Sequence, residues 1–301
     1  DFNKGSYSEA VEAKNDAEHI TMVLYPNDAS ESGKELRLKQ QYLLASASLK
    51  DVIRKWEKIH GHDYDTFDEY NVFQMNDTHP TIAVAELMRI LMDEKDLHWD
   101  QAWDITTSTM AYTNHTLLPE ALETWPVPLM EKLLPRPMEI IYHINKMFLH
   151  DIAMRWPGDK DKQARMSLID EAGDKAVRMA YLAIVGSFSV NGVAALHSKL
   201  LCEGLFKDFY QLWPEKFNNK TNGVTPRRWM AHANPAMTEL ISHTIGNEWV
   251  RDLGQIEKLK EYAYGDHEKF RKKWREVKQQ NKQRLADLVK ENCDVDFDTA
   301  S

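Results

Sequence analysis

Apolar residues recur at intervals of three and four along most of the chain, which is the spacing of one helical face. The clearest stripe, in residues 34–56, consists of Leu38, Tyr42, Ala45, Leu49, Ile53 and Trp56. The same spacing predicts further helices over residues 6–25, 100–112, 137–156 and 267–293. The first of these opens with a capping box of Ser6 and Glu9. Long helices therefore dominate the predicted fold.

Two shorter apolar runs predict strands. Residues 71–75 are apolar and partly alternating and precede a turn, so they predict a strand that runs into a loop, with a helix restarting near Thr81. The seven apolar residues 179–185 fit a buried helix or a buried strand, and the Gly-Ser pair after them favours a strand. Residues 191–202 then predict a helix. Strand, tight turn and helix make an α/β unit, so we expect a helix-rich α/β fold.

Composition and charge exclude several classes of protein. The 301 residues include 47 acidic and 38 basic side chains, and this net charge of −9 argues against nucleic-acid binding. The two cysteines, Cys202 and Cys293, form no disulfide framework and no C-x-x-C metal pair, so no metal is expected. No apolar run approaches the roughly 20 residues of a membrane span, so no membrane partner is expected.

Three polar clusters interrupt the apolar pattern, at residues 76–80 (Asn-Asp-Thr-His-Pro), 114–116 (Asn-His-Thr) and 218–225. Loops at strand ends are where α/β proteins place ligands. Asn, Asp, His and Thr supply the mixture of hydrogen-bond donors and acceptors that suits neutral hydroxyl groups, and sugars are such ligands. The common nucleotide-binding, zinc-protease and serine-hydrolase motifs do not occur.

Each cluster also has a purely structural interpretation. Asp77 or Thr78 would cap the helix that follows, His115 would be a partly buried histidine satisfied by its neighbours, and Asn222 with Gly223 would form a turn. Residue types alone leave both interpretations open.

Together, the clusters and their neighbours resemble the α-glucan phosphorylases, the family of glycogen, starch and maltodextrin phosphorylases. The resemblance runs from residue 1 to about residue 259 and keeps the same order throughout. The segments that carry it are Tyr-Pro-Asn-Asp at 25–28, Gly-Lys-Glu-Leu-Arg-Leu-Lys-Gln at 33–40, Asn-Asp-Thr-His-Pro at 76–80, Tyr-Thr-Asn-His-Thr at 112–116, Leu-Pro-Glu-Ala-Leu-Glu at 118–123, Gly-Val-Ala at 192–194, Asn-Lys-Thr-Asn-Gly at 219–223 and Thr-Pro-Arg-Arg-Trp at 225–229.

The resemblance implies a glycosyltransferase in which inorganic phosphate cleaves the terminal α-1,4-linked glucose of a glucan and releases glucose 1-phosphate. It implies pyridoxal 5'-phosphate as cofactor. As catalytic residues it implies His115, near the glucose 6-hydroxyl, and Asn222, on a ring hydroxyl. The remaining implied residues are Asp77, His79, Thr116 and Glu123 for substrate binding and Trp229 beside the cofactor.

The resemblance further implies that these residues are an internal third of a two-domain chain of the GT-B type. Residues 1–215 would be the later part of the N-terminal domain, and residues 216–301 the junction and the opening of the C-terminal domain. The cofactor-anchoring lysine and the phosphate-binding motif have no match here, so the piece alone is expected to be inactive. The parent protein would be a cytoplasmic, allosteric homodimer.

Two other functions remain open at this stage. One is a non-catalytic carbohydrate-binding or interaction module of the same fold. The other is a retaining glycosidase built on Asp77 and Glu123, which would require their carboxyl groups about 5 Å apart.

Overall fold

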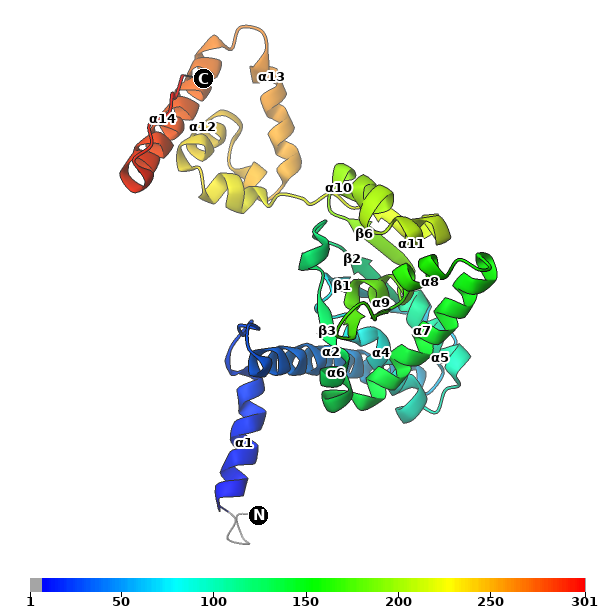
Figure 1. Cartoon of the computed structure of the whole chain (residues 1–301). Coiled ribbons are helices and arrows are strands. Elements are labelled where there is room, and N and C mark those ends of the chain that lie inside the picture. The colour runs from blue at the N-terminus through cyan, green and yellow to red at the C-terminus, as the bar shows by residue number, and fades with distance from the viewer. Residues whose placement is uncertain (1–6, 301) are drawn as a thin grey trace. The chain divides into compact units, whose positions relative to one another are not determined.

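The chain forms two compact units, Asp1–Thr221 (unit 1) and Asn222–Ser301 (unit 2). The computed structural model describes residues 7–300, with side chains from residue 11 onwards. Ser6 of the predicted capping box and the side chain of Glu9 therefore lie outside the described residues. Figure 1 shows unit 1 as helices around a small sheet and unit 2 as helices alone.

Unit 1 is built on a four-stranded parallel sheet. Its strands are β1 (Phe73–Asn76), β2 (Met110–Thr113), β6 (Ser189–Gly192) and β7 (Phe217–Asn219), and they are paired in that order. A second, antiparallel sheet has the order β3 (Thr124–Pro126), β5 (Ala176–Arg178) and β4 (Ile169–Asp170).

Helices make up most of the rest of unit 1, so the predicted helix-rich α/β class is confirmed. They are α1 (Tyr7–Met22), α2 (Glu31–His60), α3 (Phe67–Tyr70), α4 (Ile82–Arg89), α5 (Trp99–Thr109), α6 (Val127–Leu133), α7 (Pro135–Arg155), α8 (Lys160–Met166), α9 (Met179–Val185), α10 (Ala195–Leu200) and α11 (Lys207–Leu212). The predicted strand at 71–75 is β1, shifted by one or two residues. The apolar stripe predicted for residues 34–56 lies on α2, whose buried face includes Leu38, Leu49 and Trp56.

Three predicted elements are wrong in type or extent. The helix expected over residues 100–112 ends at Thr109, and the chain passes directly into strand β2. The strand expected at 179–185 is the helix α9, which is buried on nearly all sides and so lacks the polar face that would have marked it as a helix. The helix expected over 191–202 begins only at Ala195, because Asn191 and Gly192 belong to strand β6.

A buried carboxylate joins α4 to α2. The side chain of Glu86 is fully buried and accepts two hydrogen bonds from the Arg89 guanidinium, at 2.8 Å from Nε and 2.9 Å from Nη2. From α2, Tyr42 Oη donates to the carboxylate at 3.0 Å and Ser46 Oγ at 2.6 Å. Burial and the Glu86 carboxylate together raise the pKa of Tyr42. A buried charge is tolerated only where it is paired and hydrogen-bonded in this way.

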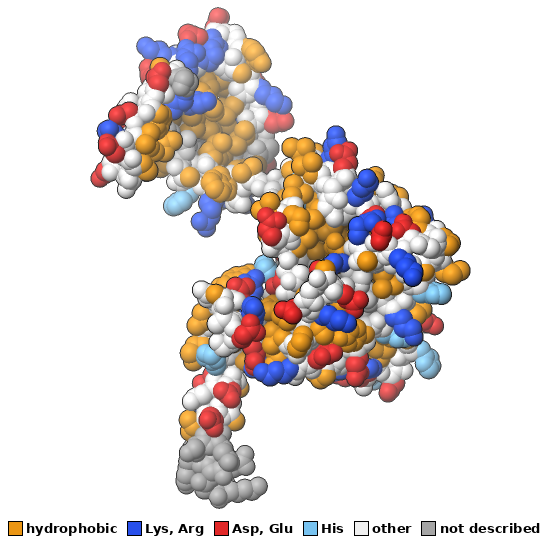
Figure 2. Space-filling view, viewed as in Figure 1, with side chains coloured by type: hydrophobic (Ala, Val, Ile, Leu, Met, Phe, Trp, Pro, Cys, Tyr) orange, Lys and Arg blue, Asp and Glu red, His pale blue; other side chains and the backbone are white. Residues whose placement is uncertain are grey.

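Unit 2 has a small core of its own. Its helices are α12 (Pro235–Ile245), α13 (Lys260–Ala263) and α14 (Glu268–Cys293), with 3-10 turns at Glu248–Val250 and Leu253–Leu259. Met237, Ile241 and Trp249 are buried together, and Trp274 and Val277 of α14 pack against them. Figure 2 shows apolar side chains gathered on one face of this unit. Leu285 and Leu288, farther along the apolar face predicted for α14, are more than half exposed.

The Glu86 network predicts a large stability effect from one substitution. We expect Glu86→Ala to lower the free energy of unfolding by about 3–5 kcal/mol, because Arg89, Tyr42 and Ser46 then lose the buried acceptor that they share and Arg89 keeps only its pair with Glu94, at 2.7 Å. Glu203→Ala is the control, because Glu203 forms only an exposed pair with Lys199 at 3.9 Å and should contribute less than about 1 kcal/mol. Urea unfolding followed by tryptophan fluorescence measures both variants. Equal losses would contradict the prediction.

Candidate functional site

The parallel sheet brings polar residues from four strands to one edge. Because all four strands run the same way, their carboxyl ends meet, and the register sets Asn76 opposite Thr113, Thr113 opposite Asn191, and Asn191 opposite Asn218. We call these four residues the strand-end row. Ligands of open α/β sheets bind outside this edge.

Hydrogen bonds fix the side chains of the strand-end row. Thr113 Oγ1 donates to Asn191 Oδ1 at 2.7 Å and accepts from Gln74 Nε2 at 2.8 Å. Asn218 Nδ2 donates to Ser189 Oγ at 2.8 Å. Side chains held by such supporting bonds need little rearrangement when a ligand binds.

His115 joins this row from the loop after β2. Its exposed ring places Nε2 2.5 Å from Asn76 Oδ1, and because an amide oxygen only accepts, Nε2 is the donor. A second imidazole, His197 of α10, accepts from the backbone N–H of Val193 at 3.2 Å through Nδ1. Burial lowers the pKa of His197, and the charge of His115 lowers it further, so the two rings are electrostatic neighbours.

Gly192 allows α10 to approach the sheet edge. A Cβ at this position would lie 2.6 Å from His197 Nδ1 and 2.9 Å from the Cα of Ser198. His197 could not be singled out from the sequence, because the helix predicted over residues 191–202 placed it in mid-helix rather than in the first turn after a strand.

Asp77 and His79 lie in the loop between β1 and α4. Asp77 has a left-handed backbone (φ 67°), its N–H donates to Thr113 O at 3.0 Å, and its Oδ1 accepts from the N–H of Thr78 at 2.6 Å. Neither Asp77 nor Thr78 caps the next helix: the cap residue is Thr81, which makes no side-chain capping bond. The structural interpretation of this loop as a helix cap is therefore wrong.

Glu123 has a largely buried carboxyl group, with 12 % of its side chain exposed. Gln41 Nε2 of α2 donates to its Oε1 at 2.8 Å, and Arg37 Nε lies 3.8 Å from the same oxygen. Burial raises the pKa of Glu123 and the Asp77 carboxylate adds to the rise, while Gln41, His79 and Arg37 oppose it. Asp77, His79 and Glu123 are thus within electrostatic range of one another.

A cavity of about 560 Å³ lies against α2, and of these three residues only His79 lines it. Arg37 and Gln41 line it from α2, and Asn76 and His79 line it from the end of β1. The Oε2 atom of Glu123 has no hydrogen-bond partner among the described residues. The ring of Tyr25 contacts His79 edge-on, with 6.0 Å between centroids. The lining offers amide, imidazole and guanidinium groups to a ligand rich in hydroxyls.

The remaining predicted residues are placed differently. Thr116 Oγ1 accepts from the N–H of Leu118 at 3.2 Å, so it stabilises its own turn. Asn222 and Trp229 belong to unit 2 and are exposed within it, Trp229 at 68 %. A side chain this exposed is not part of an enclosed cofactor pocket, so the described residues around Trp229 do not by themselves fit pyridoxal phosphate.

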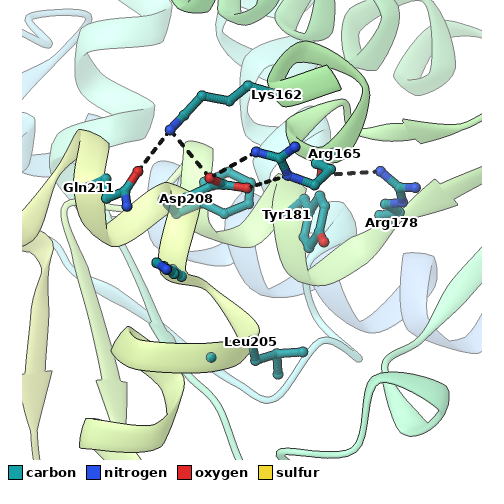
Figure 3. A pocket seen from close by; sticks show the side chains of 10 residues that line it. Lys162, Arg165, Arg178, Tyr181, Leu205, Asp208 and Gln211 are labelled. Atoms are coloured by element: carbon teal, nitrogen blue, oxygen red, sulfur yellow. Dashed lines mark hydrogen bonds and ion pairs between the residues drawn. The ribbon is translucent and has the colours of Figure 1, made fainter. Parts of the chain in front are cut away.

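A different polar cavity, of about 580 Å³, lies between α8 and α11 (Figure 3). Three of its four basic side chains already have partners: Lys162 Nζ donates to Gln211 at 2.8 Å, and Arg165 Nε pairs with Asp208 at 2.9 Å. Arg178 pairs with Asp170 at 3.1 Å and donates to three backbone carbonyls. These contacts join α8, α11 and β5, so the paired side chains around the cavity hold these elements together.

Two kinds of feature are absent from residues 7–300. No three His, Cys, Asp or Glu side chains are grouped as metal ligands there. In the same part of the chain, no helix combines the length and apolar character needed to cross a membrane.

Comparison with known proteins identifies relatives over almost the whole chain. The family model described as carbohydrate phosphorylase matches residues 1–301. The chain is 54 % identical to a glycogen phosphorylase of Synechocystis sp. over 98 % of its length, and 50 % identical to glycogen phosphorylase 2 of Dictyostelium discoideum, also over 98 %. It is 52 % identical to the muscle form of Mus musculus over 94 %. It spans 34, 29 and 34 % of these three proteins, about a third of their length.

The buried Glu123 carboxyl predicts a pH dependence of stability. The pKa of Glu123 is higher in the folded state than in the unfolded state, where it is about 4.3. Between these two values the folded state keeps a proton that the unfolded state has released. Stability should therefore fall as pH rises through the folded pKa. Glu123→Gln removes the titrating group, so its stability relative to wild type should grow between pH 4 and pH 7. Urea unfolding across this range measures the difference, and a constant difference would contradict the prediction.

Proposed function

This chain belongs to the carbohydrate phosphorylase family, and from that premise we propose that the protein containing it transfers the terminal α-1,4-linked glucosyl unit of a glucan to inorganic phosphate. The products would be glucose 1-phosphate and a glucan one unit shorter. The observation that supports this most directly is the pairing of His115 with Asn76 at the end of parallel strands. Next to that pair, His79 lines a cavity together with Asn76, and Asp77 and His79 both act electrostatically on Glu123.

In the proposed mechanism, the chain's own residues bind and orient the glucosyl unit. His115 would contact the 6-hydroxyl region, and Asn222 would hydrogen-bond a ring hydroxyl. Asp77, His79 and Glu123 would line the pocket, with Thr116 shaping the turn beside it. Hydrogen bonds that tighten as the sugar ring flattens towards an oxocarbenium ion stabilise the transition state more than the ground state.

The proposal includes pyridoxal 5'-phosphate, which in this family supplies acid–base chemistry through its phosphate group. The residues that hold it would lie outside these 301, and Trp229, which is exposed in unit 2, would contact it only where those residues complete the pocket. We further propose that residues 1–215 are the later part of the N-terminal domain and residues 216–301 the junction and the opening of the C-terminal one. The whole protein would be an allosterically controlled, cytoplasmic homodimer.

Substitution of His115 and of Asn222 tests the catalytic assignment in the whole protein. His115→Ala and Asn222→Ala should each lower kcat for glucose 1-phosphate formation from maltodextrin and phosphate on the order of a hundredfold, the effect of losing a hydrogen bond that tightens in the transition state. Cofactor absorbance should stay at the wild-type level. His150→Ala, an exposed histidine of α7, is the control and should keep full activity.

Three outcomes would contradict this assignment. Turnover near wild type in both variants would remove His115 and Asn222 from the catalytic groups. Release of free glucose instead of glucose 1-phosphate would favour a retaining glycosidase. Glucan binding without any turnover in the wild-type protein would favour a non-catalytic carbohydrate-binding module.

A further inference from the structure

The turn of residues 192–194, which follows β6, leaves the sheet next to the loop that carries His115. The N–H of Asn114, the residue before His115, donates to the backbone oxygen of Asn191 at 2.9 Å. The two segments therefore diverge from paired positions of β2 and β6. A displacement of the turn would act on the backbone beside His115.

The same turn is bonded on its other side to the segment that follows β7. The N–H of Lys220 donates to the backbone oxygen of Gly192 at 3.1 Å. Asn222, the other residue proposed as catalytic, follows two positions later in the sequence. The turn of residues 192–194 is thus joined to the segments that lead to both proposed catalytic residues.

His197, in the first turn of α10, holds this turn by a single hydrogen bond. The backbone N–H of Val193 donates to His197 Nδ1 at 3.2 Å. Because this N–H donates, Nδ1 carries no proton, and the neutral ring has its proton on Nε2. Burial lowers the pKa of His197 and so favours the same neutral form. His197 therefore acts here as a hydrogen-bond acceptor.

The place of the His197 ring is itself fixed. The ring lies so close to β6 that a Cβ on Gly192 would be 2.6 Å from Nδ1. The next residue of α10, Ser198, donates from Oγ to Asn219 Oδ1 of β7 at 3.1 Å. Contacts with two strands thus hold α10 at the sheet edge, and supported side chains of this kind position their partners precisely.

Stability does not explain why a histidine stands at position 197. Its Nε2 atom is buried and has no hydrogen-bond partner among the described residues. A buried donor without a partner is unfavourable, and an asparagine could supply the Nδ1-type acceptor without it. Departures from full hydrogen bonding are expected at functional sites rather than elsewhere.

We propose that His197 is a positioning residue for the glucosyl transfer. Through Nδ1 it fixes the N–H of Val193 and so holds the turn of residues 192–194 between the segments that lead to His115 and Asn222. The inference rests on the proposed function, because it requires a glucosyl unit at this edge of the sheet. His197 acts through the backbone and needs no contact with the sugar.

Two amide side chains separate the roles of the two ring nitrogens in the whole protein. The oxygen of an asparagine reaches the place of Nδ1, whereas a glutamine amide reaches that of Nε2 and leaves Val193 without its acceptor. His197→Gln should lower kcat for glucose 1-phosphate formation from maltodextrin and phosphate about tenfold, the effect of one hydrogen bond. His197→Asn should keep kcat within about twofold of wild type. His150→Gln, the same change at an exposed histidine of α7, is the matched control and should keep full activity.

Hydrogen–deuterium exchange measures the hydrogen bond independently of turnover. His197→Gln should raise the exchange rate of the Val193 amide roughly tenfold, because the amide loses its acceptor. His197→Asn should leave that rate near the wild-type value. The KM for maltodextrin should change less than kcat in His197→Gln, since only the terminal glucosyl unit would lie at this edge.

Each alternative result has a defined meaning. Wild-type kcat in His197→Gln, or equal losses of kcat in His197→Gln and His197→Asn, would overturn the proposal. Faster exchange at Val193 without a lower kcat, or a loss of native circular dichroism in His197→Gln, would make His197 a structural residue and overturn it as well. A wild-type protein that forms no glucose 1-phosphate would refute the proposed function together with this inference. An active wild type with unaffected variants would refute this inference alone.

Discussion

Parallel pairing of four short strands is the constraint on which the strand-end row of unit 1 depends. β1, β2, β6 and β7 are separated by whole helices in the sequence, yet the pairing register sets Asn76, Thr113, Asn191 and Asn218 side by side. The contact between His115 and Asn76 spans 39 positions of the chain and exists only because β1 and β2 end together. A shift in that register would separate the two side chains.

Helix α2 supplies the second constraint, because its buried face is not wholly apolar. Tyr42 and Ser46 hydrogen-bond the buried Glu86, whereas Arg37 and Gln41 approach the carboxyl group of Glu123. One helix therefore supplies hydrogen bonds to a structural carboxylate and also lines the cavity beside the strand-end row. The hydrogen bond between Gln41 and Glu123 joins groups 82 positions apart, so the cavity depends on how α2 packs against the rest of unit 1.

The helices with one polar face could be predicted from the sequence, and the buried elements could not. α2, α7 and α14 each combine apolar spacing with a charged face, and their positions follow from the chain alone. In α9 both faces are apolar, so the pattern of apolar residues does not distinguish a helix from a strand. β2 follows α5 without a turn residue, and only its pairing with β1 and β6 makes residues 110–113 a strand.

The helix-rich α/β class, the family and the polar loops at residues 76–80 and 114–116 could be predicted from the sequence, because these depend on local composition and on the order of motifs. The folded chain was needed to show that Asp77 does not cap a helix, that His197 neighbours His115, and that Glu123 is buried beside Gln41. Burial and hydrogen-bond partners come from segments far apart in the chain, and no local pattern of residues encodes the distance between such segments.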